Sequence, residues 1–362
     1  MKTSSENMEL SKSKYISIVV GAMVGISLLI LPATLTKGTH QDGWISAIIG
    51  VIYPMTFVIL SSYIISKHPD ENILAISKKH FGKIIGSMFN LVWLTFCGFV
   101  GINVLAGYNN LMRSYVVGWL SPFKFIIICA LVAAYAAYSG LQTVGKICEV
   151  AMIVTIILSV SPMQALKVAS TLNVKPILGS GIHAILLNVP GSLMSYSGIE
   201  VILIFHPYVK EKKKIKWYSI ISTIFVCILY TWVCFVSIYY LGPDIVTKSA
   251  WPLILATQSV TVTIINNYSY FFILMWGIIG IRCIAIYYYS SMVIVKDFLP
   301  KTKKLYICVG VYIIFVYLAM KLGNELNRRA IVDKIIQVYV IINLVGLIII
   351  CIQLYFKRNE NK

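Results

Sequence analysis

The sequence predicts an all-α, polytopic membrane protein with ten transmembrane helices arranged as two halves of five. Of its 362 residues, 59% are hydrophobic and 12% are charged, whereas a soluble domain carries about a quarter charged residues. The charges form short clusters between long apolar stretches, and the mean hydropathy is +0.84, which argues against a soluble protein with a large core. Two spans are interrupted at corresponding places in the two halves, and such paired breaks are typical of a transporter-type binding site at the membrane midplane.

Each span is a run near or above the roughly 20 apolar residues that a helix needs to cross a bilayer. The first run is too long for a signal peptide core and lacks a small-residue cleavage site, so we expect it to remain as a span. The ten runs cover residues 15–36, 44–66, 86–112, 123–140, 143–162, 182–206, 217–241, 266–295, 304–321 and 332–356.

The spans divide into repeats at about 15–162 and about 182–356, within a single membrane domain that covers residues 1–362. Because each half has an odd number of spans, the two halves lie in opposite orientations, which predicts an inverted repeat. The halves share no clear sequence identity, so this prediction depends on the topology and on the matched breaks.

Lysine and arginine residues predict the orientation, because cytoplasmic loops carry an excess of both. With the N-terminus inside, the loops and tails on that side hold 20 basic residues and the outer loops hold 10, so we expect both termini on the cytoplasmic side. An outer cluster runs against this rule and is either a docking surface for a partner or a tolerated exception. It consists of Lys321, Arg328, Arg329 and Lys334.

The net charge of +18 does not indicate nucleic acid binding. The basic residues are 26 Lys and 5 Arg, and they lie in short loops and tails where they set topology and meet membrane lipids. A nucleic-acid surface would favour arginine. The chain has no nucleophile elbow, phosphate loop, zinc motif or Cys-x-x-Cys pair, so we expect no enzymatic activity, no cofactor and no metal, and the cysteines are expected to pack as small apolar residues.

Two segments outside the spans carry structure of their own. Glu71 to Ile85 has apolar residues at helical spacing with lysines between them, which predicts an amphipathic helix on the cytoplasmic membrane surface. Pro243 to Val260, after the seventh span, is either a short lid helix on the outer side or an ordered loop.

The first break is the run from Gly21 to Ser27. Glycine weakens a helix and lets a ligand or another backbone approach closely, although the four-residue spacing of Gly21 and Gly25 is also typical of a helix-packing face. The sixth span favours a binding site, because it carries a denser set of helix-weakening residues than packing requires.

That sixth span contains Pro190 and Gly191, and then Gly198. Where a broken helix resumes, its free amides carry partial positive charge and would bind an amino acid carboxylate. Carbonyls at the ends of the half-helices would accept from the ammonium group. The predicted ligand-binding residues are Val24, Gly25, Ile26 and Ser27 in the first break, and Tyr196, Ser197 and Gly198 in the sixth.

Three ionisable residues lie inside spans and are the predicted coupling or gating groups: Glu149, Glu200 and Arg282. A charge facing lipid is costly, so these side chains should face the interior and pair. We expect an ion pair between Glu149 and Arg282, with either a functional or a purely structural role. Glu200 is either a proton-binding or gating residue, or a structural cap on the resumed helix.

The residues of both breaks resemble a known superfamily. Gly21 to Pro32 (GAMVGISLLILP) is similar to the first-span signature of the amino acid–polyamine–organocation transporters, and Ser192 to Glu200 (SLMSYSGIE) is similar to their sixth-span signature. This resemblance implies the LeuT-type fold. More closely, the chain resembles the GerAB family of spore germination proteins in its first span, its length, and the following Gln41 to Ile45 (QDGWI). The family commonly has a second glycine where Ser27 stands.

The resemblance implies a receptor subunit in the inner membrane of a bacterial spore. It would bind a small nutrient, typically an amino acid, and act with an A subunit and a lipoprotein C subunit. The alternative is a proton-coupled amino acid transporter of the same fold. In sodium-coupled members of this fold a cation lies between the first, fifth and eighth spans, and Arg282 on the eighth span would occupy that place, so we expect no sodium coupling.

Overall fold

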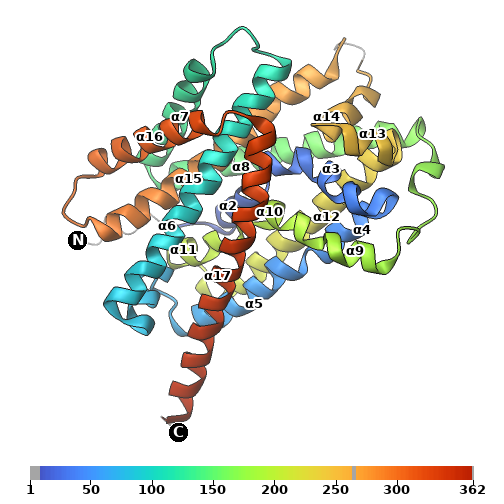
Figure 1. Cartoon of the computed structure of the whole chain (residues 1–362). Helices are drawn as coiled ribbons and strands as arrows, with labels where there is room; N and C mark the ends of the chain where they lie inside the picture. Colours follow the sequence, from blue (N-terminus) through green and yellow to red (C-terminus); the bar gives the residue numbers. More distant parts are fainter. Residues whose placement is uncertain (1–8, 263–265, 361–362) are drawn as a thin grey trace.

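A computed structural model describes residues 9–262 and 266–360, which fold into helices joined by short connections (Figure 1). Short 3₁₀ segments extend several of these helices. The α-helices are α2 (Lys12–Met23), α3 (Ser27–Thr39), α4 (Gly43–Ile49), α5 (Ile52–Lys67), α6 (Ile73–Tyr115), α7 (Pro122–Ser139), α8 (Leu141–Val160), α9 (Ile182–Asn188), α10 (Leu193–Tyr196), α11 (Ile202–Phe205), α12 (Ile215–Leu241), α13 (Pro243–Lys248), α14 (Pro252–Ala256), α15 (Tyr268–Phe298), α16 (Lys304–Lys321) and α17 (Glu325–Glu360).

The all-helical membrane architecture is confirmed, but the count of ten spans is not. In the described part of the chain, eight helices are long and apolar enough to cross a membrane, or nine if the bent sixth span counts as one. By length and hydropathy the stretch Ser27–Lys67 counts as a single span, yet the chain reverses direction between α3 and α4. A Cβ on Gly43 would lie 3.1 Å from the amide nitrogen of Thr36, whereas seven residues of continuous helix would separate them by about 10 Å.

Asp42 fastens this turn between α3 and α4. Its buried carboxylate accepts from the amides of Leu178 (2.8 Å) and Ser180 (2.9 Å) and from the Ser180 hydroxyl (2.7 Å). The neighbouring Gln41 donates from Nε2 to the carbonyl of Pro176 at 3.0 Å. The Gln-Asp-Gly sequence therefore ties the turn after the first span to the loop before α9.

The amphipathic segment before the third span forms a separate helix, as predicted. Gly82 breaks α6 with φ of +77° and ψ of 171°, a conformation that favours glycine. A Cβ on Gly86 would lie 2.6 Å from the Cα of Lys78, so residues 73–81 fold back beside the start of the long helix. Its place at a membrane surface stays a prediction.

The segment after the seventh span is helical and not an irregular loop; that these helices form a lid on the outer side stays a prediction. It forms α13 and α14, and both pack against α3. These two helices and α3 lie together on one side of the molecule (Figure 1).

The centre of the fold is formed by α6 and α15, which pack along each other and against α7, α8 and α2. The helix α17 runs along the outside of this centre from a point near α3 to the C-terminus (Figure 1). Several outer helices expose large apolar side chains, as expected for faces that meet lipid; among them are Ile128, Ile153, Ile313 and Ile341.

Candidate functional site

The first predicted break is confirmed, and its carbonyl groups are already bonded. The helix α2 ends at Met23, Val24 is extended (φ −85°, ψ 98°), and α3 begins at Ser27. The last carbonyls of a helix have no partner within it. Here three consecutive carbonyls accept from side chains of other helices: Ala22 O from Tyr287 Oη (2.9 Å), Met23 O from Tyr230 Oη (2.8 Å) and Val24 O from Arg282 Nη2 (2.8 Å).

Arg282 is fully buried and lies at the C-terminal end of α2. Besides Val24 O it donates from Nη1 to Thr155 Oγ1 on α8 at 3.3 Å. The end of a helix carries partial negative charge, so carbonyl dipoles partly compensate the guanidinium. This residue joins α2, α8 and α15.

The predicted ion pair between Glu149 and Arg282 is wrong. Among the described residues no ion pair joins these two side chains. Thr155, which does contact Arg282, lies six residues after Glu149 on the same helix. Six residues correspond to about 9 Å along the axis and about 240° around it, so Glu149 points to a different side of α8.

The sixth span is broken at Ser197 and Gly198, also as predicted. Its two parts, Ile182–Tyr196 and Ile199–Tyr208, are bent by 49°. Ser197 is extended and Gly198 has φ of +118°. The buried carboxylate of Glu200 closes the break, because Oε2 accepts from the Gly198 amide at 2.6 Å and Oε1 accepts from the Tyr53 hydroxyl. This geometry is that of the structural cap, one of the two roles predicted for Glu200.

The two breaks lie against each other. A Cβ on Gly198 would be 2.6 Å from the carbonyl oxygen of Ala22. The hydroxyl of Tyr230 on α12 lies 2.8 Å from Met23 O and 2.7 Å from Ser195 O, and so bridges the ends of both half-helices. The broken spans therefore meet at backbone distance, as expected from their glycines.

A cavity of about 480 Å³ opens beside this junction. Ligand pockets commonly measure about 300–1,000 Å³. Its walls come from four parts of the chain besides α6: one face of α3 from Ile26 to Lys37, the sixth span, the end of α13 with the two residues after it, and the first turns of α17. Representative lining residues are Ile26, Ser27, Lys37, Asn103, Met194, Ser195, Lys248, Arg328, Arg329 and Asp333.

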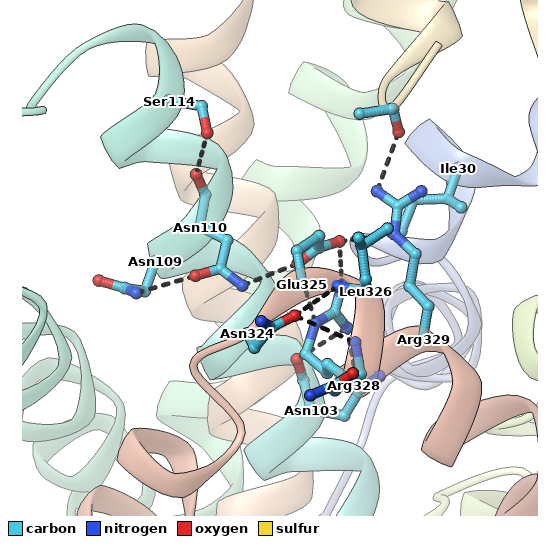
Figure 2. Close-up of polar contacts among 12 residues, drawn as sticks. Ile30, Asn103, Asn109, Asn110, Ser114, Asn324, Glu325, Leu326, Arg328 and Arg329 are labelled. Atoms are coloured by element: carbon cyan, nitrogen blue, oxygen red, sulfur yellow. Dashed lines mark hydrogen bonds and ion pairs between the residues drawn. The ribbon is translucent and has the colours of Figure 1, made fainter. Parts of the chain in front are cut away.

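Glu325, at the start of α17, organises the wall opposite α3 (Figure 2). Its Oε1 accepts from Arg328 Nη2 (2.5 Å) and Arg329 Nε (2.7 Å), and its Oε2 accepts from Arg328 Nε (3.1 Å) and Asn110 Nδ2 (2.8 Å). Arg328 also donates to the side chain of Asn103. The network thus joins α17 to α6.

Arg329 extends the network to the lid helices. It donates from Nη2 to the carbonyl of Ala250 at 2.9 Å, and its guanidinium lies 4.8 Å from the ring centroid of Trp251. Of the basic cluster that the orientation prediction places outside, Arg328 is only 2% exposed, so this arginine is not available to a partner, whereas Lys321 and Lys334 are exposed. Arg328 and Arg329 pair with Glu325, and the choice between a docking surface and a tolerated exception stays open for the rest of the cluster.

The predicted ligand-binding residues occupy different environments. Ile26 and Ser27 line the cavity. Gly25 is covered by Cys283, whose Sγ lies 3.1 Å from where a Cβ would be. The Val24 carbonyl is bonded to Arg282 and the Gly198 amide to Glu200. Two further residues, Tyr196 and Ser197, are buried, and Tyr196 donates to the carbonyl of Ala47 at 2.7 Å.

Sequence reasoning missed the tyrosines that bind the breaks. Tyr287 belongs to the run Tyr287-Tyr288-Tyr289, which is typical of a membrane-interface anchor, yet all three side chains are buried. Tyr230 gave no signal beyond its place in an apolar span. These donors are needed because the carbonyls at the end of a broken helix are buried and have no partner within the helix. Which side chains reach them depends on how distant helices pack, and the local sequence does not show that packing.

The two touching breaks, beside a cavity within a helical membrane domain, define a protein with the LeuT-type transporter fold. The structure is similar to that of MhsT in complex with L-phenylalanine, with a TM-score of 0.63 and 13% identity, covering 93% of this chain and 87% of that one. At this identity the likeness shows the fold.

The chain belongs to the spore germination protein family, whose family model matches residues 9–328. It is 27% identical to spore germination protein A2 of Bacillus subtilis over 85% of this chain and 86% of that protein. It is 21% identical to spore germination protein KB of Bacillus subtilis (89% and 88%) and 20% identical to spore germination protein GerQB of Bacillus cereus (86% and 86%).

Proposed function

We propose that this chain is the B subunit of a germinant receptor in the spore inner membrane, which binds a small amino-acid-like nutrient and signals to an A subunit and a lipoprotein C subunit. The observation that carries the proposal is the cavity beside both breaks, lined by Ile26 and Ser27 of the first and by Ser195 of the sixth. Membership of the germination family supports the receptor role.

The carboxylate of the ligand belongs at the start of α3. Its N-cap residue Ile26 has no side-chain hydrogen bond, and Ile26 and Ser27 both line the cavity. The first amides of a helix lack partners within it and attract anions. The carbonyls at the end of α2 are not available to an ammonium group, since Tyr287, Tyr230 and Arg282 bind them.

The ammonium group therefore needs an acid elsewhere in the cavity, and we assign it to Asp333. Two acids line the cavity. Glu325 is paired with Arg328 and Arg329, whereas within the described ranges Asp333 has no ion pair. In this pose the ligand lies in the cavity between α3 and α17, beside the contact of Arg329 with Ala250.

The test is ligand-induced thermal stabilisation of the purified full-length chain, using the twenty amino acids one by one. Filling the cavity with Ser27→Phe should abolish the stabilisation by any amino acid that raises the melting temperature. Ser139→Phe, at an exposed position outside the cavity, should leave the response unchanged. Asp333→Asn should weaken it. An equal response in all four proteins would place the ligand elsewhere.

A transporter remains the second candidate, favoured by the fold likeness to MhsT over 93% of this chain. Uptake of the same amino acid, radiolabelled, into proteoliposomes separates the two functions. Binding without flux supports the receptor, and concentrative uptake driven by a pH gradient supports the transporter. The guanidinium of Arg282 already places a positive charge where α2, α8 and α15 meet. Replacing sodium by choline should therefore change neither binding nor flux.

A further inference from the structure

The cavity beside the breaks extends away from them along α3. Ile26 at the first break and Lys37 near the end of α3 both line it, and this stretch of helix corresponds to about 16 Å along its axis. Lys248, the last residue of α13, lines it as well, and α13 packs against α3. We call the part of the cavity formed by Lys37 and Lys248 the lysine end. An amino acid whose carboxylate lies at the start of α3 would meet this end with its side chain.

The charged groups of the cavity wall do not balance. Four cationic side chains stand against two carboxylates; they are Lys37, Lys248, Arg328, Arg329, Glu325 and Asp333. Glu325 pairs with both arginines, and the charged neighbours of Asp333 are Lys37, Arg329 and Arg328. The wall therefore carries an excess of positive charge, which attracts a ligand of net negative charge.

Neither lysine is used by the protein itself. Across residues 9–262 and 266–360, the Nζ atoms of Lys37 and Lys248 make no hydrogen bond and no ion pair. An ammonium group has three donors and no acceptor, so each lysine can bind only a group that accepts. Because Asp333 is assigned to the ammonium group of the ligand, the lysines are left for an accepting group of that ligand.

Two further donors face the same part of the cavity. Arg329 uses Nε for Glu325 and Nη2 for the carbonyl of Ala250, so the hydrogens of Nη1 remain unused (Figure 2). The hydroxyl oxygen of Ser249 accepts from the amide of Trp251 at 3.2 Å, which leaves its hydrogen to donate. Both residues line the cavity, so donors outnumber acceptors there.

We propose that the lysine end binds a carboxylate, and that the ligand of this cavity is therefore an acidic amino acid. The inference rests on the proposed function, which places the main-chain groups of the ligand at the start of α3 and at Asp333. A carboxylate only accepts, and hydrogen bonds between charged partners are the strong ones. The amide of the corresponding neutral amino acid has the same shape, but it carries no charge and turns donors of its own toward Lys37, Lys248 and Arg329.

The test compares matched ligands by thermal stabilisation of the purified full-length chain. L-glutamate is paired with L-glutamine and L-aspartate with L-asparagine, and glutarate supplies two carboxylates without an ammonium group. We expect one acidic amino acid to bind about tenfold more tightly than its amide, or better. Both lysines are exposed, so raising the salt from about 0.05 M to about 0.5 M should weaken binding of the acid and hardly affect the amide.

Substitutions at the lysine end should change the preference between acid and amide. Lys37→Gln and Lys248→Gln should each lower the ratio of the two affinities several-fold, and Lys248→Glu should favour the amide. A general loss of folding would weaken both ligands alike and so cancels from this ratio. The matched control is Lys321→Gln, which removes an exposed positive charge outside the cavity and should keep the preference of the parent.

The outcomes separate this inference from the proposed function. Equal binding of acid and amide by the parent, or a preference that survives in the double variant Lys37→Gln with Lys248→Gln, would overturn the inference and leave the proposed function standing. Binding of glutarate without binding of any amino acid would support the carboxylate site and overturn the amino acid ligand of the proposed function. No stabilisation by any of the five compounds would overturn the inference, and the panel of twenty amino acids then decides the proposed function on its own.

Discussion

Replacing Gly198 by alanine tests whether the two broken spans are packed against each other. Gly198 has φ of +118° and ψ of −16°, which L side chains rarely adopt. The new Cβ would lie 2.6 Å from the carbonyl oxygen of Ala22 and 2.6 Å from the hydroxyl of Tyr287. The carbonyl is backbone and has no rotamer to change, so the variant must move the two breaks apart.

The expected loss has two parts. A residue held in a sparsely populated backbone region costs about 1–3 kcal/mol, and overpacking a buried site costs about 1–3 kcal/mol. Gly198→Ala should therefore lower the free energy of unfolding by about 2–6 kcal/mol. Gly140 isolates the first part, because its φ is +105° and a Cβ there would meet no atom within 4 Å; Gly140→Ala should lose about 1–3 kcal/mol.

The assay is unfolding of the purified full-length chain in mixed micelles with increasing denaturing detergent, followed by tryptophan fluorescence. The free energy of unfolding of Gly198→Ala should be lower than that of Gly140→Ala by the cost of overpacking, about 1–3 kcal/mol. Adding Tyr287→Phe to Gly198→Ala removes one of the three closest atoms and should recover a fraction of the loss. Equal losses at Gly198 and Gly140 would show that the breaks do not touch, and would refute this reasoning.

Further substitutions test the other contacts of the site. Gly25→Ala should be destabilising alone but tolerated together with Cys283→Ala, since that Sγ lies 3.1 Å from the new Cβ; a double-mutant cycle in the same unfolding assay measures the recovery. Asp42→Asn should lose about 1.5–3 kcal/mol of stability, the value of one hydrogen bond to a charged group, whereas Asp244→Asn at an exposed site should lose almost none. Arg282→Met should lose about 2–6 kcal/mol by leaving two buried acceptors unpaired, with the same loss in sodium and in choline chloride.

The breaks were predictable from sequence because the residues that interrupt a helix act locally. Glycine at 25 and 198 weakens helical pairing wherever it stands, and Pro190 removes an amide donor. The same holds for the amphipathic segment, since its apolar spacing predicts a helix and Gly82 ends it. These features require no knowledge of what packs against them.

The partners of the buried charges were not predictable. Both the position along α8 and the rotation of that helix about its axis place Thr155, and not Glu149, against Arg282. The orientation of α8 is set by its packing against α2 and α15. Packing between distant helices cannot be predicted from the local sequence. The burial of Arg328 was not predictable for the same reason: its carboxylate partner Glu325 is three residues away, but it also packs against Asn103 of the distant α6.

Three side chains already bond to the backbone carbonyls of the first break, so a ligand does not have to. Tyr287, Tyr230 and Arg282 bond to the carbonyls of residues 22–24, so the protein's own side chains hold the backbone of the break. Binding energy is then free to act on the elements that enclose the cavity. Of these, α17 and the segment between α13 and α14 are joined by Arg329, whose guanidinium also pairs with Glu325. A ligand that competes for these contacts would move α17, the helix that runs from the cavity to the C-terminus.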